Sequence, residues 1–105
     1  MKDIEIIEYY IFADKSDVKL GKYKTLEDLT NNAKSYLNDV DNDVYAGIGA
    51  EFYILEDNKK ELGAIDFINK HKNNDKFAFC KDIETLDIKL PIEVETAFKG
   101  LIEVL

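Results

Sequence analysis

The chain has 105 residues and a net charge of −8, which arises from 22 acids against 14 lysines with no arginine. This length suits one domain, and we predict a single α+β domain over residues 1–105. Bidentate grips on phosphate or guanine need arginine, and a negative field repels a polyanion, so direct nucleic-acid binding is disfavoured. No apolar run approaches the roughly 20 residues of a membrane span, and the charged start is unlike a signal peptide, so we expect a cytoplasmic protein.

The chain begins with a β-rich run over residues 4–13. Its apolar residues change parity near Ile6 and Ile7, which indicates either a bulge there or a strand covered on both faces in its second half. A turn composition at residues 14–17 then predicts a hairpin that returns through Val18–Lys24. The lysines of this second strand suit a sheet edge.

A helix is predicted to follow, with Thr25 as its cap and Asp28 at the capping-box position. Residues 38–43, with the sequence NDVDND, end this helix with turn-forming side chains. Its apolar stripe consists of Leu26, Leu29, Ala33, Tyr36 and Leu37.

The longest run that is almost free of charge, residues 44–55, has the alternation of a central strand. One parity is apolar and is expected to form the floor of the core; it comprises Val44, Ala46, Ile48, Ala50, Phe52 and Ile54. The other parity comprises Tyr45, Gly47, Gly49, Glu51, Tyr53 and Leu55. Residues 35–58 contain no lysine, so this strand lies within an acidic window.

The second half of the chain contains shorter apolar segments. The polar run 56–61 predicts a hairpin loop and residues 62–69 a strand, although a helical turn also fits the latter. Residues 70–76 read as a basic loop, residues 77–81 as a short strand, and residues 82–89 remain ambiguous.

A final helix is predicted from Pro91, at its first position, to the C-terminus. Gly100 either permits close packing there or is merely tolerated. The apolar stripe of this helix consists of Val94, Phe98, Leu101, Ile102 and Leu105. The element order ββα-βββ-α predicts an antiparallel sheet of about five strands with two helices on one face.

No pattern in the sequence indicates an enzyme. The Asp39-x-Asp41-x-Asp43 run resembles the start of a calcium loop, but the glycine and glutamate that such a loop requires are absent. His71 is the only histidine, and the single cysteine, Cys80, suits a buried strand better than a nucleophile. We therefore predict no catalytic residue, no metal site and no cofactor.

Gly47 and Gly49 leave the second face of the central strand without side chains between Tyr45 and Tyr53. A neighbouring side chain packing over the glycines, or a kink, is the simpler interpretation. The alternative is an exposed binding face, because tyrosine is enriched at interfaces.

The charge layout favours a binding protein whose partner is basic. Small, acidic, arginine-free chains resemble, in size and charge only, toxin immunity proteins and phage anti-defence inhibitors such as anti-CRISPRs. That resemblance suggests an inhibitor that fills the basic cleft of a nuclease or toxin, whereas the alternative is a non-catalytic regulatory or structural module that forms a homodimer. The candidate partner-binding residues are Asp39, Asp41, Asp43, Tyr45, Glu51, Tyr53, Glu56 and Asp57, with the acidic stretch 82–95 as a rival.

Overall fold

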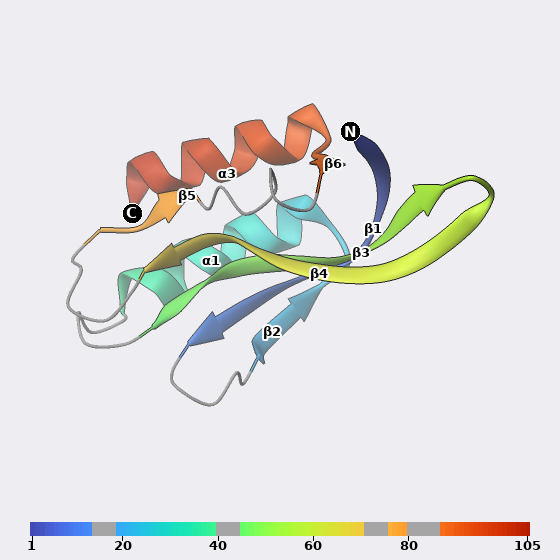
Figure 1. Ribbon diagram of the computed structural model, residues 1–105. Helices are drawn as coiled ribbons and strands as arrows, with labels where there is room; N and C mark the ends of the chain where they lie inside the picture. Colours follow the sequence, from blue (N-terminus) through green and yellow to red (C-terminus); the bar gives the residue numbers. More distant parts are fainter. Residues whose placement is uncertain (14–18, 40–44, 71–75, 80–86) are drawn as a thin grey trace.

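The computed structural model describes residues 1–13, 19–39, 45–70, 76–79 and 87–105. Figure 1 shows one sheet with two helices packed against the same face. The elements are β1 (Lys2–Ala13), β2 (Lys19–Tyr23), α1 (Leu26–Asn38), β3 (Ala46–Glu56), β4 (Lys59–Lys70), β5 (Ala78–Phe79), β6 (Ile88–Lys89) and α3 (Ile92–Val104). No helix within these ranges is long and apolar enough to cross a bilayer.

The sheet has the strand order β2-β1-β3-β4-β5, and every pair along this path is antiparallel. The predicted α+β architecture is therefore confirmed, with β2 at one edge as its lysines indicated. The structure adds β6, a short strand that pairs parallel to β1 through Lys2–Ile88 and Asp3–Lys89. Sequence periodicity could not detect β6, because a strand of two residues shows no alternation.

The parity change in the first strand corresponds to a bulge. The register between β1 and β3 shifts between Ile6 and Glu8, so Ile7 is the extra residue. Because one extra residue reverses the facing of every side chain beyond it, Ile4 and Ile11 both reach the helix-covered face despite their opposite parity. The bulge is thus confirmed, and the second half of the strand is also covered on both faces, since the four consecutive residues Tyr9 to Phe12 are buried.

Helix α1 begins as its sequence predicted. The Thr25 hydroxyl oxygen accepts a hydrogen bond from the Asp28 backbone N–H at 3.2 Å. Leu29, Ala33 and Leu37 are buried, whereas Tyr36 is 44% exposed. The predicted apolar stripe is therefore narrower than expected, since Tyr36 lies at its solvent side.

We expect Thr25→Ala to lower the free energy of unfolding by about 1 kcal/mol, because it removes the acceptor from the first turn of α1. Thr30→Ala is the matched control, since its hydroxyl donates back to the Glu27 carbonyl within the same helix. That change should be neutral or slightly stabilising, because alanine is the better helix former. Urea unfolding of both variants checks this, and equal losses would contradict the capping role.

The core lies between the helices and the predicted apolar parity of β3. Ala46, Ile48, Ala50 and Phe52 are all fully buried, so the assignment of this face is confirmed. The central side chain of α3, Phe98, packs on Phe67 of β4 with ring centroids 5.3 Å apart. Val44 lies outside the described residues.

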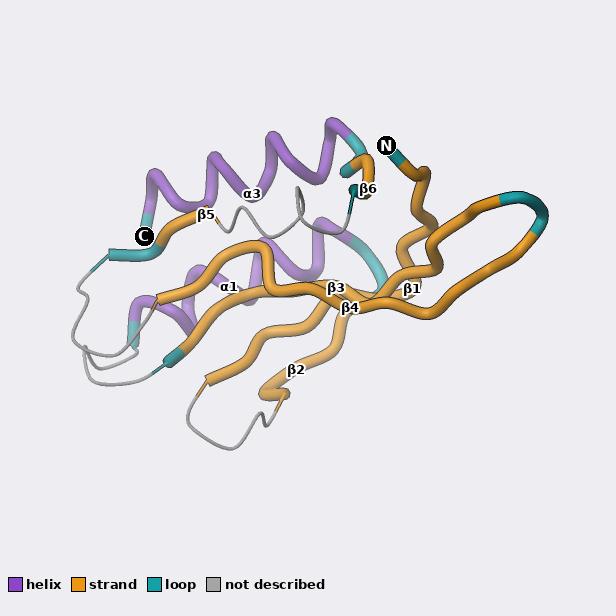
Figure 2. Tube along the Cα trace, viewed as in Figure 1, coloured by secondary structure: helices purple, strands orange, loops and turns teal. Residues whose placement is uncertain are grey.

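The hairpin joining β3 and β4 has longer strands and a shorter turn than predicted. Its turn consists only of Asp57 and Asn58, with φ of 48° and 65°, and Glu56 pairs directly with Lys59. Positive φ at both central residues is typical of a type I′ turn, whose twist matches that of the strands. Residues 62–69 thus belong to a strand, and the helical alternative is wrong. Figure 2 shows that this hairpin extends past the ends of both helices.

Other details of the second half differ from prediction. Pro91 lies one position earlier than expected, as the N-cap of α3. A Cβ at Gly100 would meet nothing within 4 Å, so this glycine serves no close packing. Lys70, expected in a loop, is the last residue of β4 and is only 3% exposed. Asp41, Asp43, His71 and Cys80 lie outside the described residues, as do most of the predicted basic loop and residues 82–86.

Candidate functional site

The sheet face opposite the helices carries the second parity of β3, and two aromatic side chains of β1 cover its glycines. Tyr10 pairs with Gly49 and Phe12 with Gly47 across the ladder. A Cβ added to Gly47 would lie 2.7 Å from Phe12 Cζ. The interpretation that neighbouring side chains pack over the glycines is therefore confirmed, and Gly47 and Gly49 are buried.

A carboxylate at the centre of this face accepts hydrogen bonds from two tyrosines. The Tyr10 hydroxyl donates to Asp66 Oδ1 at 2.8 Å, and the Tyr45 hydroxyl donates to Asp66 Oδ2 at 3.1 Å. The Tyr45 ring also packs on Phe12, with centroids 5.2 Å apart. We call Tyr10, Phe12, Tyr45 and Asp66 the tyrosine–aspartate cluster; it joins β1, β4 and the segment before β3.

The cluster keeps the Tyr10 phenol protonated. Burial raises the pKa of Tyr10 well above its ordinary value, and the hydrogen bond to Asp66 and the charges of Asp66 and Glu51 raise it further. A phenol whose pKa is raised remains a hydrogen-bond donor throughout the physiological range. Tyr10 therefore acts as a fixed donor to the carboxylate and is unsuited to acid–base chemistry near neutral pH.

Next to the cluster, Glu8 forms ion pairs with two lysines around β2. Glu8 is 15% exposed and lies 3.7 Å from Lys22 and 3.2 Å from Lys24, measured from carboxylate oxygen to Nζ. Glu8 pairs with Glu51 in the β1–β3 ladder. The lysines at the edge thus offset the carboxylates of this face, so the face is less acidic than the lysine-free window suggested.

The structure distributes the sequence-predicted binding residues over the full length of β3. Asp39 is the exposed C-cap of α1, and Tyr45 belongs to the tyrosine–aspartate cluster at the start of β3. Half-buried Glu51 lies further along, and Tyr53 has Lys60 Nζ 5.5 Å from its ring centroid. Glu56 and Asp57 lie at the hairpin end. They do not form one patch, and Asp41 and Asp43 lie outside the described ranges.

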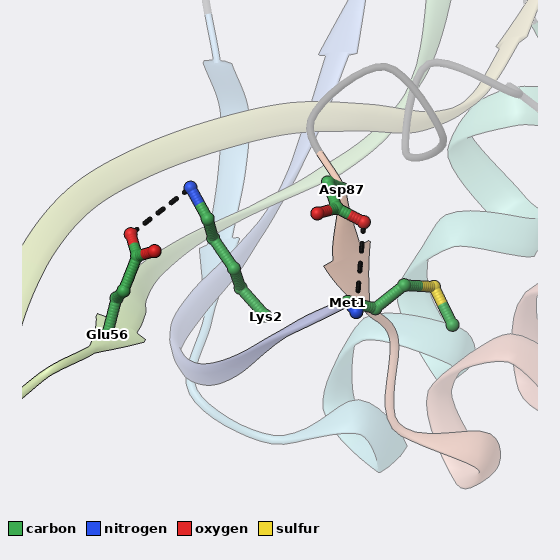
Figure 3. Close-up of polar contacts among 4 residues, drawn as sticks. All are labelled: Met1, Lys2, Glu56 and Asp87. Carbon is green, nitrogen blue, oxygen red and sulfur yellow. Dashed lines mark ion pairs between the residues drawn. The ribbon is translucent and has the colours of Figure 1, made fainter.

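At the hairpin end, lysines accompany the acids. Figure 3 shows Lys2 pointing toward Glu56 from the neighbouring strand, with Nζ 3.2 Å from Oε2, while the Met1 amino group lies 3.8 Å from Asp87. Lys60 of β4 also forms an ion pair with Glu5 of β1, with its Nζ 3.3 Å from Oε2. Glu56 therefore projects little uncompensated charge, since Lys2 screens its carboxylate.

The strongest charge imbalance among the described residues lies on the helices, of which the sequence had indicated only Asp39 and the rival stretch 82–95. The outer surface of α1, α3 and the α1 C-cap carries six acids against two lysines. The acids are Glu27, Asp28, Asp39, Glu93, Glu95 and Glu103, and the lysines are Lys34 and Lys99. We call this set the acidic helix layer. Neither helix has a basic residue in its last turn to offset the negative end of its dipole.

The sequence indicated the acidic helix layer only in part, through Asp39 and the stretch 82–95, because its acids are dispersed along the chain between apolar residues. Only the packing of α1 and α3 side by side on one sheet face collects them (Figure 1). The helix periodicity already contained the signal, since residues off the apolar stripe must face solvent. The tyrosine–aspartate cluster had no such signal, because it depends on the register of three separate segments.

Within the described residues, no group of three or more histidine, cysteine, aspartate or glutamate side chains is arranged to hold a metal ion. Two depressions lined by described residues are an open groove of about 710 Å³ beside Met1 and Ile92 and one of about 530 Å³ at the hairpin. Neither contains a nucleophile beside a base. No protein-family model, curated protein or solved structure matches the chain.

Proposed function

We propose that this chain is a cytoplasmic, non-catalytic binding protein that inhibits a basic, nucleic-acid-acting protein by covering its cleft. Toxin immunity proteins and phage anti-defence inhibitors are the classes of protein meant. The observation that carries the proposal is the charge: −8 in 105 residues, with no arginine. A nucleic-acid-acting enzyme presents a positive cleft, and an acidic protein gains a fast, steered encounter with such a surface.

The acidic helix layer is the best candidate for the contact surface. Glu93 and Glu103 are exposed on α3, and Ile92 is 77% and Val104 53% exposed beside them. The exposed apolar side chains supply surface that a partner can bury, while carboxylates around them steer the encounter from the polar rim. The hairpin end offers Glu56 and Asp57, but Lys2, Lys59 and Lys60 surround them.

The first experiment identifies the partner. The tagged chain is used to capture proteins from its own source at low salt, and bound material is released by a salt gradient. Recovery of a basic nuclease or toxin whose activity the purified chain then inhibits would support the proposal. Recovery of nucleic acid, or of a partner that binds equally at all salt concentrations, would overturn it.

Once a partner is identified, two double variants that change the net charge by the same amount locate the contact surface. We expect Glu93→Lys with Glu103→Lys to weaken binding at least tenfold at low salt and to flatten its salt dependence, because both charges lie on the acidic helix layer. Glu56→Lys with Asp57→Lys changes the net charge equally at the hairpin end, and we expect a smaller effect there.

A larger effect of the hairpin reversal would instead assign binding to Glu56 and Asp57. A third variant, Asp41→Lys with Asp43→Lys, tests two further sequence-predicted acids. Unchanged affinity in all three variants would exclude these three pairs of acids from the contact surface. Thermal unfolding of each variant controls for loss of the fold.

A further inference from the structure

The outer edge of β4 differs from the other edge of the sheet. β5 pairs only with Ile68 and Asn69, and no described strand pairs with the β4 edge from Lys59 to Phe67. β2, at the opposite edge, has only five residues and carries lysines. Short, lysine-bearing edges resist strand addition, whereas long edges with small or apolar side chains invite it.

The middle of the β4 edge has the features of an accessible strand. Leu62 is 66% exposed, and Gly63 and Ala64 beside it are small enough to let another backbone approach. These three residues and Glu51 line a shallow depression of about 330 Å³. The segment therefore combines exposed apolar surface with room for a neighbour.

Hairpin geometry determines which backbone groups point outward. A two-residue type I′ turn is closed by a hydrogen-bonded pair, here Glu56 with Lys59. Hydrogen-bonded and non-hydrogen-bonded pairs alternate along an antiparallel ladder. The backbone N–H and C=O groups of Lys60, Leu62, Ala64 and Asp66 consequently point away from β3, toward the side on which no described strand pairs with this part of β4.

We infer that this edge pairs with the same edge of a second copy, antiparallel and centred on Gly63. In that register, the outward groups of Leu62 in one copy bond to those of Ala64 in the other, and those of Lys60 to those of Asp66. Leu62 thus lies opposite the small side chain of Ala64, and the Lys60 cation lies opposite the Asp66 carboxylate. By symmetry, each of these pairs occurs twice in the dimer. The strand is complementary to itself, which a two-fold interface requires.

A neighbouring register lacks this complementarity. Centring the pair on Leu62 places two leucines opposite each other and Lys60 opposite Ala64. Centring the pair on Ala64 places Lys60 opposite Ile68, which already pairs with β5 on that side. The Gly63 register alone pairs opposite charges and leaves β5 in place.

Strand pairing over this short segment covers less surface than the roughly 800 Å² per partner of a stable interface. We therefore expect a dimer that dissociates in the micromolar range, observed by sedimentation velocity from about 1 µM to about 1 mM at physiological salt. A chain that stays monomeric over this range overturns the inference. Because only the purified chain is used, the result does not depend on the proposed inhibitor function.

A pair of matched variants tests the register. Lys60→Glu places two carboxylates opposite each other across the dimer seam and should weaken dimerisation about tenfold. Lys59→Glu changes the net charge equally, but across the seam it lies opposite Phe67 and meets no carboxylate of the second copy; thermal unfolding controls for its effect on the Glu56 pair within the hairpin. Ala64→Pro removes an outward N–H and should abolish the dimer while leaving the β3 ladder intact. Equal effects of the two glutamate variants would overturn the register.

Cross-linking provides an independent measurement of the same register. In a Cys80→Ser background, a mixture of the Leu62→Cys and Ala64→Cys chains should form a disulfide between them, and each chain alone should form little, because residue 62 lies opposite residue 64. Cross-linking of either chain alone at the same rate would contradict the pairing. Protection of this edge from hydrogen exchange only when an inhibited partner is bound would assign it to that partner instead.

Discussion

Replacing Gly47 with alanine is expected to lower the free energy of unfolding by about 3 kcal/mol. A Cβ at this position would overlap the Ile68 carbonyl oxygen and lie 2.9 Å from the Asn69 Cα. Both are backbone atoms of the neighbouring strand, so no side-chain rotation relieves the overlap. The β3–β4 ladder must separate locally or shift, at the centre of the sheet.

Gly100→Ala is the matched control, because it adds the same methyl group where nothing lies within 4 Å. It should raise the free energy of unfolding by about 0.5–1 kcal/mol, since alanine favours a helix and restricts the unfolded chain. Urea denaturation of the two variants gives the comparison. Similar effects of both would contradict the close approach of β4 to Gly47.

Asp66→Ala should lower the free energy of unfolding by about 2–3 kcal/mol, because it removes a charged acceptor from two tyrosine hydroxyls at once. Tyr10 is only 6% exposed, so water reaches its hydroxyl poorly. In a double-mutant cycle with Tyr10→Phe, the combined loss should be smaller than the sum of the two single losses, since both changes remove the same hydrogen bond. Additive losses would show that the hydrogen bond does not couple the strands.

The tyrosine–aspartate cluster also predicts a loss of stability at alkaline pH. The pKa of Tyr10 is raised in the folded state, so above about pH 10 the unfolded chain loses this proton while the folded chain keeps it. The stabilising contribution of the protonated Tyr10 phenol is therefore fully present below that pH, and the free energy of unfolding falls as the pH rises further. Tyr10→Phe should show a shallower fall, and an identical slope would contradict the raised pKa.

The proposed binding surface and the tyrosine–aspartate cluster occupy different parts of the molecule, which separates effects on stability from effects on recognition. Changes at Gly47 and Asp66 should reduce stability, and they lie on the sheet face opposite the acidic helix layer. Charge reversal at Glu93 and Glu103 should change recognition while leaving the core intact, because both side chains are exposed. Measuring both properties on all variants tests this division.

The sequence by itself determined the local features, because each depends on residues close together in the chain. Thr25 and Asp28 begin α1, the alternation of β3 selects its buried face, and the change of parity at Ile6–Ile7 produces the bulge. These patterns follow from backbone hydrogen bonding and from the burial of one face of each element. They were enough to predict the α+β class and the position of both helices.

Only the tertiary structure decided how distant residues combine. The pairing of Tyr10 with Gly49, and of Gly49 with Asp66, places a buried phenol next to a carboxylate 56 positions away. The tertiary structure also separates Asp39, which precedes β3, from Asp57, which follows it, and it brings the acids of α1 and α3 together on one layer. Register and packing arise from the simultaneous fit of all strands and helices, so no local pattern contains them.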